Sequence, residues 1–266
     1  MGKLEEIRER LEVCDKQIVS VLEDRMDIIK EIMEYKKENG LPILQPEQEK
    51  RQRKMLKEHV KENTYKEEIL DIFTYIVENS RRIQARTLFT HNIFLIGFMG
   101  VGKSTVSDYL SKILASPQVE MDQVIVNKEH MSINKIFEEY GEEYFRNCES
   151  NTLIELRSKN HAVISCGGGV PLRPHNVELM KKNGYVIWLT AKPEAILERV
   201  KDSTERPLLN GHMNVSYISS LMESRREKYS AAADLIIDTT GKEIVEICEE
   251  LLQKLSAMQK NKKEDE

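Results

Sequence analysis

The chain lacks the features of several common protein classes. It has four cysteines in 266 residues, namely Cys14, Cys148, Cys166 and Cys248, with no CxxC pair and no metal-type spacing. No apolar run approaches the roughly 18 residues of a membrane span. These absences exclude a disulfide scaffold and a membrane protein, and free thiols predict a reducing, cytoplasmic compartment.

An excess of positive charge is also missing. The net charge is −5 at pH 7, and residues 1–90 hold 18 Lys and Arg against 19 Asp and Glu. Such a balanced surface does not provide the basic stripe to which a nucleic-acid backbone binds. We therefore expect small molecules as partners, with neither nucleic acid nor a membrane among them.

Glycine and proline are scarce in the first third of the chain, where only Gly40, Pro42 and Pro46 occur after residue 2. Apolar residues recur there every three or four positions, which is the spacing of amphipathic helices. No strand pattern appears. Three helices are predicted. The first ends near residue 39, the second runs from 46 to about 62, and the third runs from about 65 to 88.

The pattern changes at residue 92. Short apolar runs then alternate with helical segments, and these runs are NIFLIG, HAVISC, YVIWLT and DLIID. This alternation predicts a parallel sheet with crossover helices. We therefore expect two domains, an all-α domain at 1–89 and an α/β domain at 90–259, followed by a charged tail at 260–266.

The first of these runs leads into GFMGVGKST, which fits the GxxxxGK[ST] pattern of a phosphate-binding loop. Its glycines let backbone N–H groups surround phosphate oxygens, and the following helix N-terminus adds partial positive charge. The pattern assigns Lys103 to the β- and γ-phosphates and Ser104 to Mg²⁺. The expected ATP-binding residues of the loop are Gly97, Gly100, Val101, Gly102, Lys103, Ser104 and Thr105.

Five more motifs follow this loop, namely MD at 121–122, GEEYFRNCE at 141–149, CGGGV at 166–170, RPLL at 206–209 and SRREKYSAAAD at 224–234. Together, in this order and spacing, they resemble shikimate kinases over residues 92–255. The resemblance implies a P-loop kinase with a parallel five-stranded sheet. Its reaction would transfer the γ-phosphate of ATP to shikimate.

The chemistry of shikimate, a ring carboxylate with hydroxyls, fits these motifs. Arg146 and Arg225 are candidates for its carboxylate because a guanidinium meets a carboxylate bidentately. Asp122 is placed to orient or deprotonate the attacking hydroxyl. Arg206 resembles the lid arginine that closes on the phosphates in this family. The glycines expected to let the backbone approach the substrate are Gly167, Gly168 and Gly169.

One departure from the resemblance concerns the metal. Shikimate kinases usually carry two aspartates flanking one residue, whereas this chain has Glu120-Met121-Asp122. The Glu120 side chain is one methylene longer and still reaches a Mg²⁺-bound water. We therefore expect Ser104 and Glu120 as the metal-binding residues.

Polar residues interrupt the apolar stripes of the first domain. Arg25 lies in a seam of apolar residues spaced by seven, Lys36 follows on nearly the same face, and Ser80 and Gln84 interrupt the third helix. A buried cation is costly unless an anion or hydrogen-bond partners meet it. Two interpretations follow: a coiled-coil-like dimer module whose polar residues set the register, and an anion site between helices.

The inward-facing set of Arg, Lys, Ser and Gln favours the anion site. The pattern is similar to the all-helical chorismate mutases over residues 3–88, in IRERLEVCDKQIVSVLEDRMDII, YKKENGLPI, PEQEK and ENSRRIQ. The resemblance implies rearrangement of chorismate to prephenate, which needs a folded substrate and fixed donors at the ether oxygen. The chorismate-binding residues that it implies are Arg8, Arg25, Lys36, Glu49, Ser80 and Gln84.

The length of the first helix predicts a homodimer. A helix of some 36 residues spans about 54 Å, which is longer than the other two helices can cover. Arg8 lies about 100° around the helix from Arg25, and in the family that the chain resembles this arginine comes from the partner subunit.

A second departure lies in ILQPEQEK. The mutase family usually has arginine at the position of Gln48 and frequently aspartate at that of Gln45, and we expect Lys50 and Arg51 to point elsewhere on the helix. The sequence thus predicts a bifunctional transferase and isomerase of aromatic amino-acid biosynthesis. The alternatives are a shikimate kinase with a non-catalytic dimerisation or regulatory module, and another small-molecule P-loop kinase.

Overall fold

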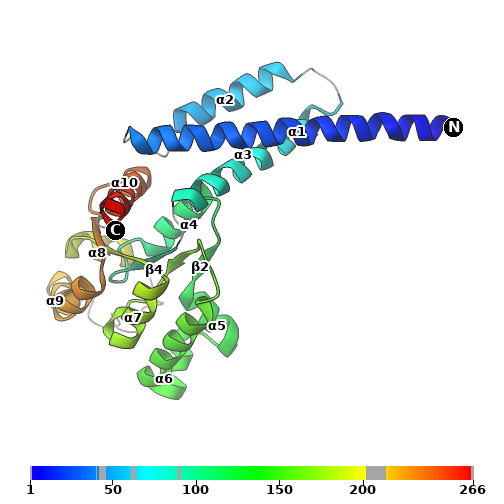
Figure 1. Cartoon of the computed structure of the whole chain (residues 1–266). Coiled ribbons are helices and arrows are strands. Elements are labelled where there is room, and N and C mark those ends of the chain that lie inside the picture. Colours follow the sequence, from blue (N-terminus) through cyan, green and yellow to red (C-terminus); the bar gives the residue numbers. More distant parts are fainter. Residues whose placement is uncertain are drawn as a thin grey trace. The chain divides into compact units, whose positions relative to one another are not determined.

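A computed structural model describes residues 2–39, 41, 46–60, 64–88, 91–201 and 214–264 of the chain (Figure 1). At residues 37, 46, 47, 49, 50, 85–88 and 259–264 it describes the backbone alone. The chain divides into two compact units, residues 1–84 and 85–266. Within the described ranges, no helix is long and apolar enough to cross a membrane.

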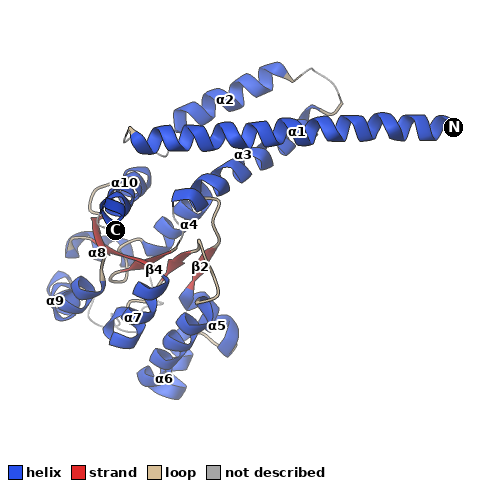
Figure 2. Ribbon diagram, viewed as in Figure 1, coloured by secondary structure: helices blue, strands red, loops and turns tan. Residues whose placement is uncertain are grey.

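The first unit is helical (Figure 2), and its helices are α1 (Lys3–Glu38), α2 (Pro46–His59) and α3 (Lys66–Leu88). The predicted all-α domain of three helices is confirmed. α1 ends where the Asn39 side chain donates a hydrogen bond of 2.8 Å to the Tyr35 carbonyl. Burial on α1 is confined to its C-terminal half, where Met33 is 2% exposed.

The N-terminal half of α1 carries large apolar side chains that no part of this unit covers. Leu4, Ile7, Leu11 and Ile18 are between 49% and 61% exposed. Burying apolar surface of this kind is favourable by about 25 cal/mol per Å². The helical unit by itself therefore leaves a long apolar stripe uncovered.

The second unit is built around a parallel sheet whose strand order is β2-β3-β1-β4-β5. All four strand pairs are parallel, so the predicted five-stranded parallel sheet is confirmed. Every residue of the central strand β1 is buried, as expected for a sheet covered on both faces. The strands are β1 (Asn92–Ile96), β2 (Gln118–Glu120), β3 (Val163–Ser165), β4 (Gly184–Thr190) and β5 (Leu235–Asp238).

Helices cover this sheet on both faces (Figure 1). α4 (Lys103–Ile113) packs with α10 (Ile244–Glu264) against the sheet, whereas α7 (Pro174–Asn183) and α9 (Val215–Ala232) pack against β4 and the short helix η1 (Val170–Leu172). The remaining helices are α5 (Met121–Glu129), α6 (Ile133–Leu156) and α8 (Pro193–Val200).

The connectivity of the sheet predicts where a ligand binds. β1 lies between β3 and β4, so the chain runs to one side of β1 through β2 and β3 and to the other side through β4 and β5. In open α/β sheets, ligands bind outside the carboxyl ends of the strands where the strand order reverses. The phosphate-loop motif follows the carboxyl end of β1 and so lies at that point.

Candidate functional sites

The loop between β1 and α4 has the backbone of an anion cradle. Gly97, Gly100 and Gly102 all have positive φ angles, of 145°, 77° and 97°. A Cβ on Gly97 would lie 2.3 Å from the Leu189 carbonyl oxygen, so only glycine fits there. The Lys103 ammonium lies across the loop and donates hydrogen bonds of 3.0 and 3.1 Å to the carbonyls of Gly97 and Phe98.

The other loop residues named from the sequence occupy the start of α4. Val101 is 1% exposed and packs in the core, while Ser104 and Thr105 are exposed on the first turn of the helix. The helix therefore directs its first N–H groups toward the space above the loop.

Ser104 is joined to Glu120 at the end of β2. The Ser104 hydroxyl lies 3.0 Å from Glu120 Oε2, and the other oxygen, Oε1, accepts from Ser107 at 2.5 Å and from Gln118 at 3.1 Å. Ser107 and Gln118 thus hold Oε1 of Glu120, and Oε2 lies beside Ser104. A hydroxyl and a carboxylate are ligands that suit Mg²⁺. Within the described ranges, no cluster of three His, Cys, Asp or Glu side chains forms another metal site.

Two carboxylates lie against the glycine segment after β3. A Cβ on Gly167 would lie 2.4 Å from Glu149 Oε1 and 2.8 Å from Asp122 Oδ1. Glu149 is fully buried, and burial together with the charge of Asp122 raises its pKa to about 7, although Arg146 acts in the opposite direction. This half of the site therefore holds a group that titrates near neutral pH.

Arg146 is the cation beside these carboxylates. Only 8% of it is exposed, and it donates to Glu149 at 2.8 Å and to Glu142 at 2.7 Å. A Cβ on Gly169 would lie 1.8 Å from Arg146 Nη1, so this glycine makes room for the guanidinium. Burial disfavours the charged guanidinium, but the two carboxylates outweigh burial and raise the pKa of Arg146.

Arg225 reaches the same segment from α9. Its Nη1 atom lies 3.8 Å from the position that a Cβ on Gly168 would take, and its guanidinium lies over the Phe98 ring at 5.8 Å. Tyr229, one turn later on α9, donates a hydrogen bond of 2.6 Å to the Gly168 carbonyl. The segment 167–169 therefore brings together the phosphate loop, two arginines and two carboxylates.

Sequence inspection did not single out Glu149 or Tyr229. Each follows a predicted arginine by one helical turn, at three residues for Glu149 and four for Tyr229, and that spacing was available in the sequence. Arg206 lies outside the described residues.

The first unit contains a cavity of about 580 Å³ between its helices. Arg25, half-buried on α1, donates a hydrogen bond to the hydroxyl of the buried Ser80 on α3, and Ser80 itself donates at 2.9 Å to the Ile76 carbonyl. Burial lowers the pKa of Arg25. The cavity is lined by Arg25, Ile29, Ile32, Lys36, Gln48, Arg51, Gln52, Met55, Val77, Ser80, Arg81 and Gln84.

Four of the six predicted chorismate-binding residues line this cavity. Arg25, Lys36, Ser80 and Gln84 are among its lining residues. Arg8 is exposed on the N-terminal half of α1, and the Glu49 side chain lies outside the described residues. The expectation that Arg51 points elsewhere is wrong, because Arg51 lines the cavity together with Gln48.

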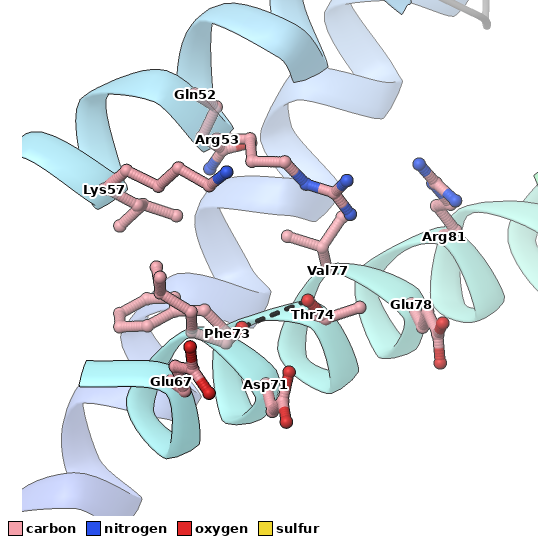
Figure 3. A pocket seen from close by; sticks show the side chains of 12 residues that line it. Gln52, Arg53, Lys57, Glu67, Asp71, Phe73, Thr74, Val77, Glu78 and Arg81 are labelled. Carbon is pink, nitrogen blue, oxygen red and sulfur yellow. Dashed lines mark hydrogen bonds between the residues drawn. The ribbon is translucent and has the colours of Figure 1, made fainter. Parts of the chain in front are cut away.

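A second groove of about 590 Å³ lies between α2 and α3 (Figure 3). Its apolar wall includes Leu56, Leu70, Phe73 and Val77. Figure 3 shows Arg53 and Lys57 on α2 facing α3, which carries acidic side chains along this groove. Both signs of charge therefore surround an apolar floor, a lining quite unlike that of the first cavity.

Two family models match the chain. The shikimate kinase model matches residues 99–256, and the model of chorismate mutase type II matches residues 7–85. The first match spans more than half of the chain and includes the phosphate loop from residue 99 onward. The second spans the cavity residues of the helical unit.

Known shikimate kinases are similar to about 60% to 67% of the chain. That of a Dehalococcoides mccartyi strain is 43% identical over 161 residues, which cover 60% of this chain and 91% of the relative. The solved structure of shikimate kinase from Acinetobacter baumannii in complex with shikimate has a TM-score of 0.60 at 32% identity and covers 67% of this chain and 98% of its own. The solved structure of the Aquifex aeolicus shikimate kinase has a TM-score of 0.54 at 40% identity. The match covers 63% of this chain and 96% of the Aquifex chain.

Proposed function

The chain belongs to the shikimate kinase family, whose model covers residues 99–256, and we propose how its own residues perform the reaction. It phosphorylates shikimate with ATP, and residues 7–85 form a chorismate mutase type II domain. The observation that carries the kinase mechanism is the meeting of Lys103, Asp122, Arg146 and Arg225 around the segment 167–169.

The phosphate loop binds ATP. Its N–H groups and the N-terminus of α4 surround the phosphates, and Lys103 leaves the loop carbonyls to meet the β- and γ-phosphates. Arg206 closes on the phosphates as the lid arginine that the resemblance implies. The proposed ATP-binding residues are Gly97, Gly100, Val101, Gly102, Lys103, Ser104, Thr105 and Arg206.

Ser104 and Glu120 would hold Mg²⁺. A carboxylate and a hydroxyl 3.0 Å apart, together with phosphate oxygens, match the few protein ligands that this ion takes. The bound ion would neutralise charge that develops on the phosphates. Ser107 and Gln118 keep the longer Glu120 side chain turned toward Ser104 and so offset the extra methylene.

Shikimate binds over the glycines 167–169. Arg146 and Arg225 hold its carboxylate, and Asp122 orients the attacking hydroxyl and accepts its proton. The reaction itself needs little more than positioning and charge stabilisation, because its transition state is loose and spreads negative charge over the phosphate oxygens. Gly167, Gly168 and Gly169 let the ring approach the backbone.

A coupled assay of ADP release with Arg225→Ala tests this assignment. The variant should raise the KM for shikimate and leave the KM for ATP little changed. Arg226→Ala is the matched control, because that neighbouring arginine is 68% exposed and pairs with Glu223 on the surface. An equal loss of affinity for both ligands would contradict the assignment.

The helical domain converts chorismate to prephenate in its 580 Å³ cavity. Support comes from the lining of this cavity, which combines inward cations with Ser80 and Gln84 and contains no acidic side chain among the described residues. The rearrangement is unimolecular, so holding the substrate folded and meeting charge at its ether oxygen is sufficient. Arg8, Arg25, Lys36, Glu49, Ser80 and Gln84 bind the substrate.

An assay for prephenate with the full chain tests this function. The alternative, a helical module kept for dimerisation or regulation, predicts no prephenate at any chorismate concentration. A lysine control variant in the kinase loop, Lys103→Ala, should form prephenate as fast as the wild type.

The protein is a homodimer in which a second copy covers the N-terminal half of α1. Support comes from the stripe of Leu4, Ile7, Leu11 and Ile18 and from the apolar groove between α2 and α3 (Figure 3). The mixed charges around that groove complement α1, whose polar face also carries both signs. In this arrangement Arg8 reaches the partner's cavity.

Sedimentation of the full chain tests the dimer. The wild type should sediment at twice the mass of the chain, and Leu11→Lys should yield monomer without prephenate formation. Glu12→Lys, beside it on the exposed side of α1, is the control and should stay dimeric. A wild-type monomer with full mutase activity would exclude both the dimer and the role of Arg8.

We place the functional domains at 1–89 and 90–259, with 260–266 as a charged tail. Limited proteolysis should release a kinase fragment that begins close to residue 90. The three buried free cysteines of the second unit, Cys148, Cys166 and Cys248, fit a reducing cytoplasm.

A further inference from the structure

One face of α2 turns toward the cavity of the helical unit. Gln48, Arg51, Gln52 and Met55 all line it, and their spacing of three, four and seven residues is that of a single helix face. Arg51 lies only about 60° around the helix and about 4.5 Å along its axis from Gln48. A side chain as long as that of arginine spans this displacement.

Cations predominate among the charged residues that line the cavity. Its described lining residues include Arg25, Lys36, Arg51 and Arg81 and no Asp or Glu, whereas those of the neighbouring groove between α2 and α3 include Glu67, Asp71 and Glu78 beside its cations. A negative charge is favourable beside several cations. The cavity therefore suits an anionic ligand.

These cations come from three different walls. Among the described residues, α1 supplies Arg25 and Lys36, α3 supplies Arg81, and α2 supplies Arg51. Arg25 is already bound to Ser80 and partly desolvated, which fixes its position. Within the described ranges, Arg51 forms no ion pair with an acidic side chain, so its charge is available to a ligand.

We propose that Arg51 binds one carboxylate of the substrate in this cavity and supplies from α2 the positive charge that Gln48 does not. The proposal rests on the mutase function, because chorismate is a dicarboxylate and needs cations on more than one wall. The guanidinium meets the carboxylate with two parallel N–H groups. Gln48 then contributes a neutral hydrogen bond at most.

The test compares Arg51→Ala with Lys54→Ala in the full chain. Lys54 lies on the same helix, is 80% exposed and lines neither cavity, so its variant removes an equal charge from the surface. Arg51→Ala should raise the KM for chorismate about 10- to 100-fold, the value of a charged hydrogen bond. Lys54→Ala should leave it within about twofold.

Variants that restore a cation test whether Arg51 binds the substrate or only supports the structure. Arg51→Lys should restore part of the affinity, and Gln48→Arg added to Arg51→Ala should restore more, with unchanged melting temperatures and kinase rates throughout. An unchanged KM in Arg51→Ala would overturn the proposal while leaving the mutase function intact.

A wild type that forms no prephenate would refute the mutase function, and Arg51 is then tested by equilibrium dialysis of chorismate. Retained binding in wild type and Lys54→Ala with a loss of about 10-fold or more in Arg51→Ala would support the proposal. Equal binding by all three proteins, or no binding by the wild type, would overturn it.

Discussion

The two candidate sites balance their charges differently. In the kinase unit, Arg146 is 8% exposed and is paired with Glu142 and with the fully buried Glu149. In the helical unit, the charged residues among the described lining of the cavity are all cations, and Arg25 meets a hydroxyl rather than a carboxylate. The buried arginine of the kinase site thus has carboxylate counter-ions, whereas Arg25 of the helical cavity has a neutral partner.

The two sites also differ in how many of their residues a single copy of the chain supplies. The kinase residues converge within a single unit on the segment 167–169, where neighbouring groups hold them before any substrate binds. The helical cavity belongs to a unit whose longest helix exposes Leu4, Leu11 and Ile18. We therefore expect the kinase to work in a monomer and the mutase to need a dimer.

The largest expected effect separates the two activities completely. Lys103→Ala removes the cation that meets the β- and γ-phosphates, and we expect shikimate phosphorylation to fall below detection in an ADP-release assay. Lys112→Ala is the control, because Lys112 is on the same helix, 71% exposed and paired with Asp108. Kinase turnover that persists in Lys103→Ala would remove the loop from the mechanism.

The reciprocal variant is Arg25→Ala. Losing one preorganised charge-binding donor typically costs about 10²–10³ in rate, so we expect prephenate formation to fall by that factor while kinase activity is retained. Lys30→Ala removes an exposed cation of the same helix, paired with Asp27, and should change neither rate. Full mutase activity in Arg25→Ala would show that the cavity is not the active site.

The fold and both families followed from local sequence patterns. The change from helical spacing to short apolar runs at residue 92 predicted the two classes of unit, and the two resemblances are confirmed by family matches at 7–85 and 99–256. These features depend on the spacing of apolar residues along the chain or on short motifs, so they can be predicted from a single sequence. The exact assignment of roles to site residues stays a prediction.

What the sequence did not reveal depends on contacts between distant segments. Glu149 lies on the buried face of α6, and only the fold brings it against Gly167 and Asp122. The wrong expectation for Arg51 has a simpler cause: three residues on a helix amount to about 300°, which returns the side chain to nearly the same face. Sequence spacing alone was sufficient to avoid that error.

A smaller effect concerns pH and tests the buried counter-ion. Burial raises the pKa of Glu149 to about 7, so it becomes neutral as the pH falls from 8 to 6 and compensates less of the charge on Arg146. We expect shikimate to bind up to about tenfold more tightly at pH 6 than at pH 8. The fluorescence of Trp188, the one tryptophan of the chain, 5.7 Å from the Tyr229 ring, reports this binding.

Glu149→Gln is the variant that isolates this group. It keeps an oxygen for Arg146 and cannot ionise, so shikimate affinity should become nearly independent of pH between 6 and 8. In the wild type the raised pKa also means that the folded unit binds more protons than the unfolded chain. Its free energy of unfolding should therefore fall as the pH rises from about 4.5 to about 7. A pH dependence of binding that survives in Glu149→Gln would point to another group.

The smallest expected effect is that of Gln48→Arg, and it sharpens the contrast between the two sites. The helical cavity already carries four cations, with Arg51 one turn from Gln48 on the same face. A fifth cation gains one carboxylate contact but is repelled by its neighbours, so the KM for chorismate should fall by no more than about threefold. If the wild type instead formed no prephenate and Gln48→Arg created the activity, Arg51 would not replace the missing charge. The helical domain would then be a module retained for assembly or regulation.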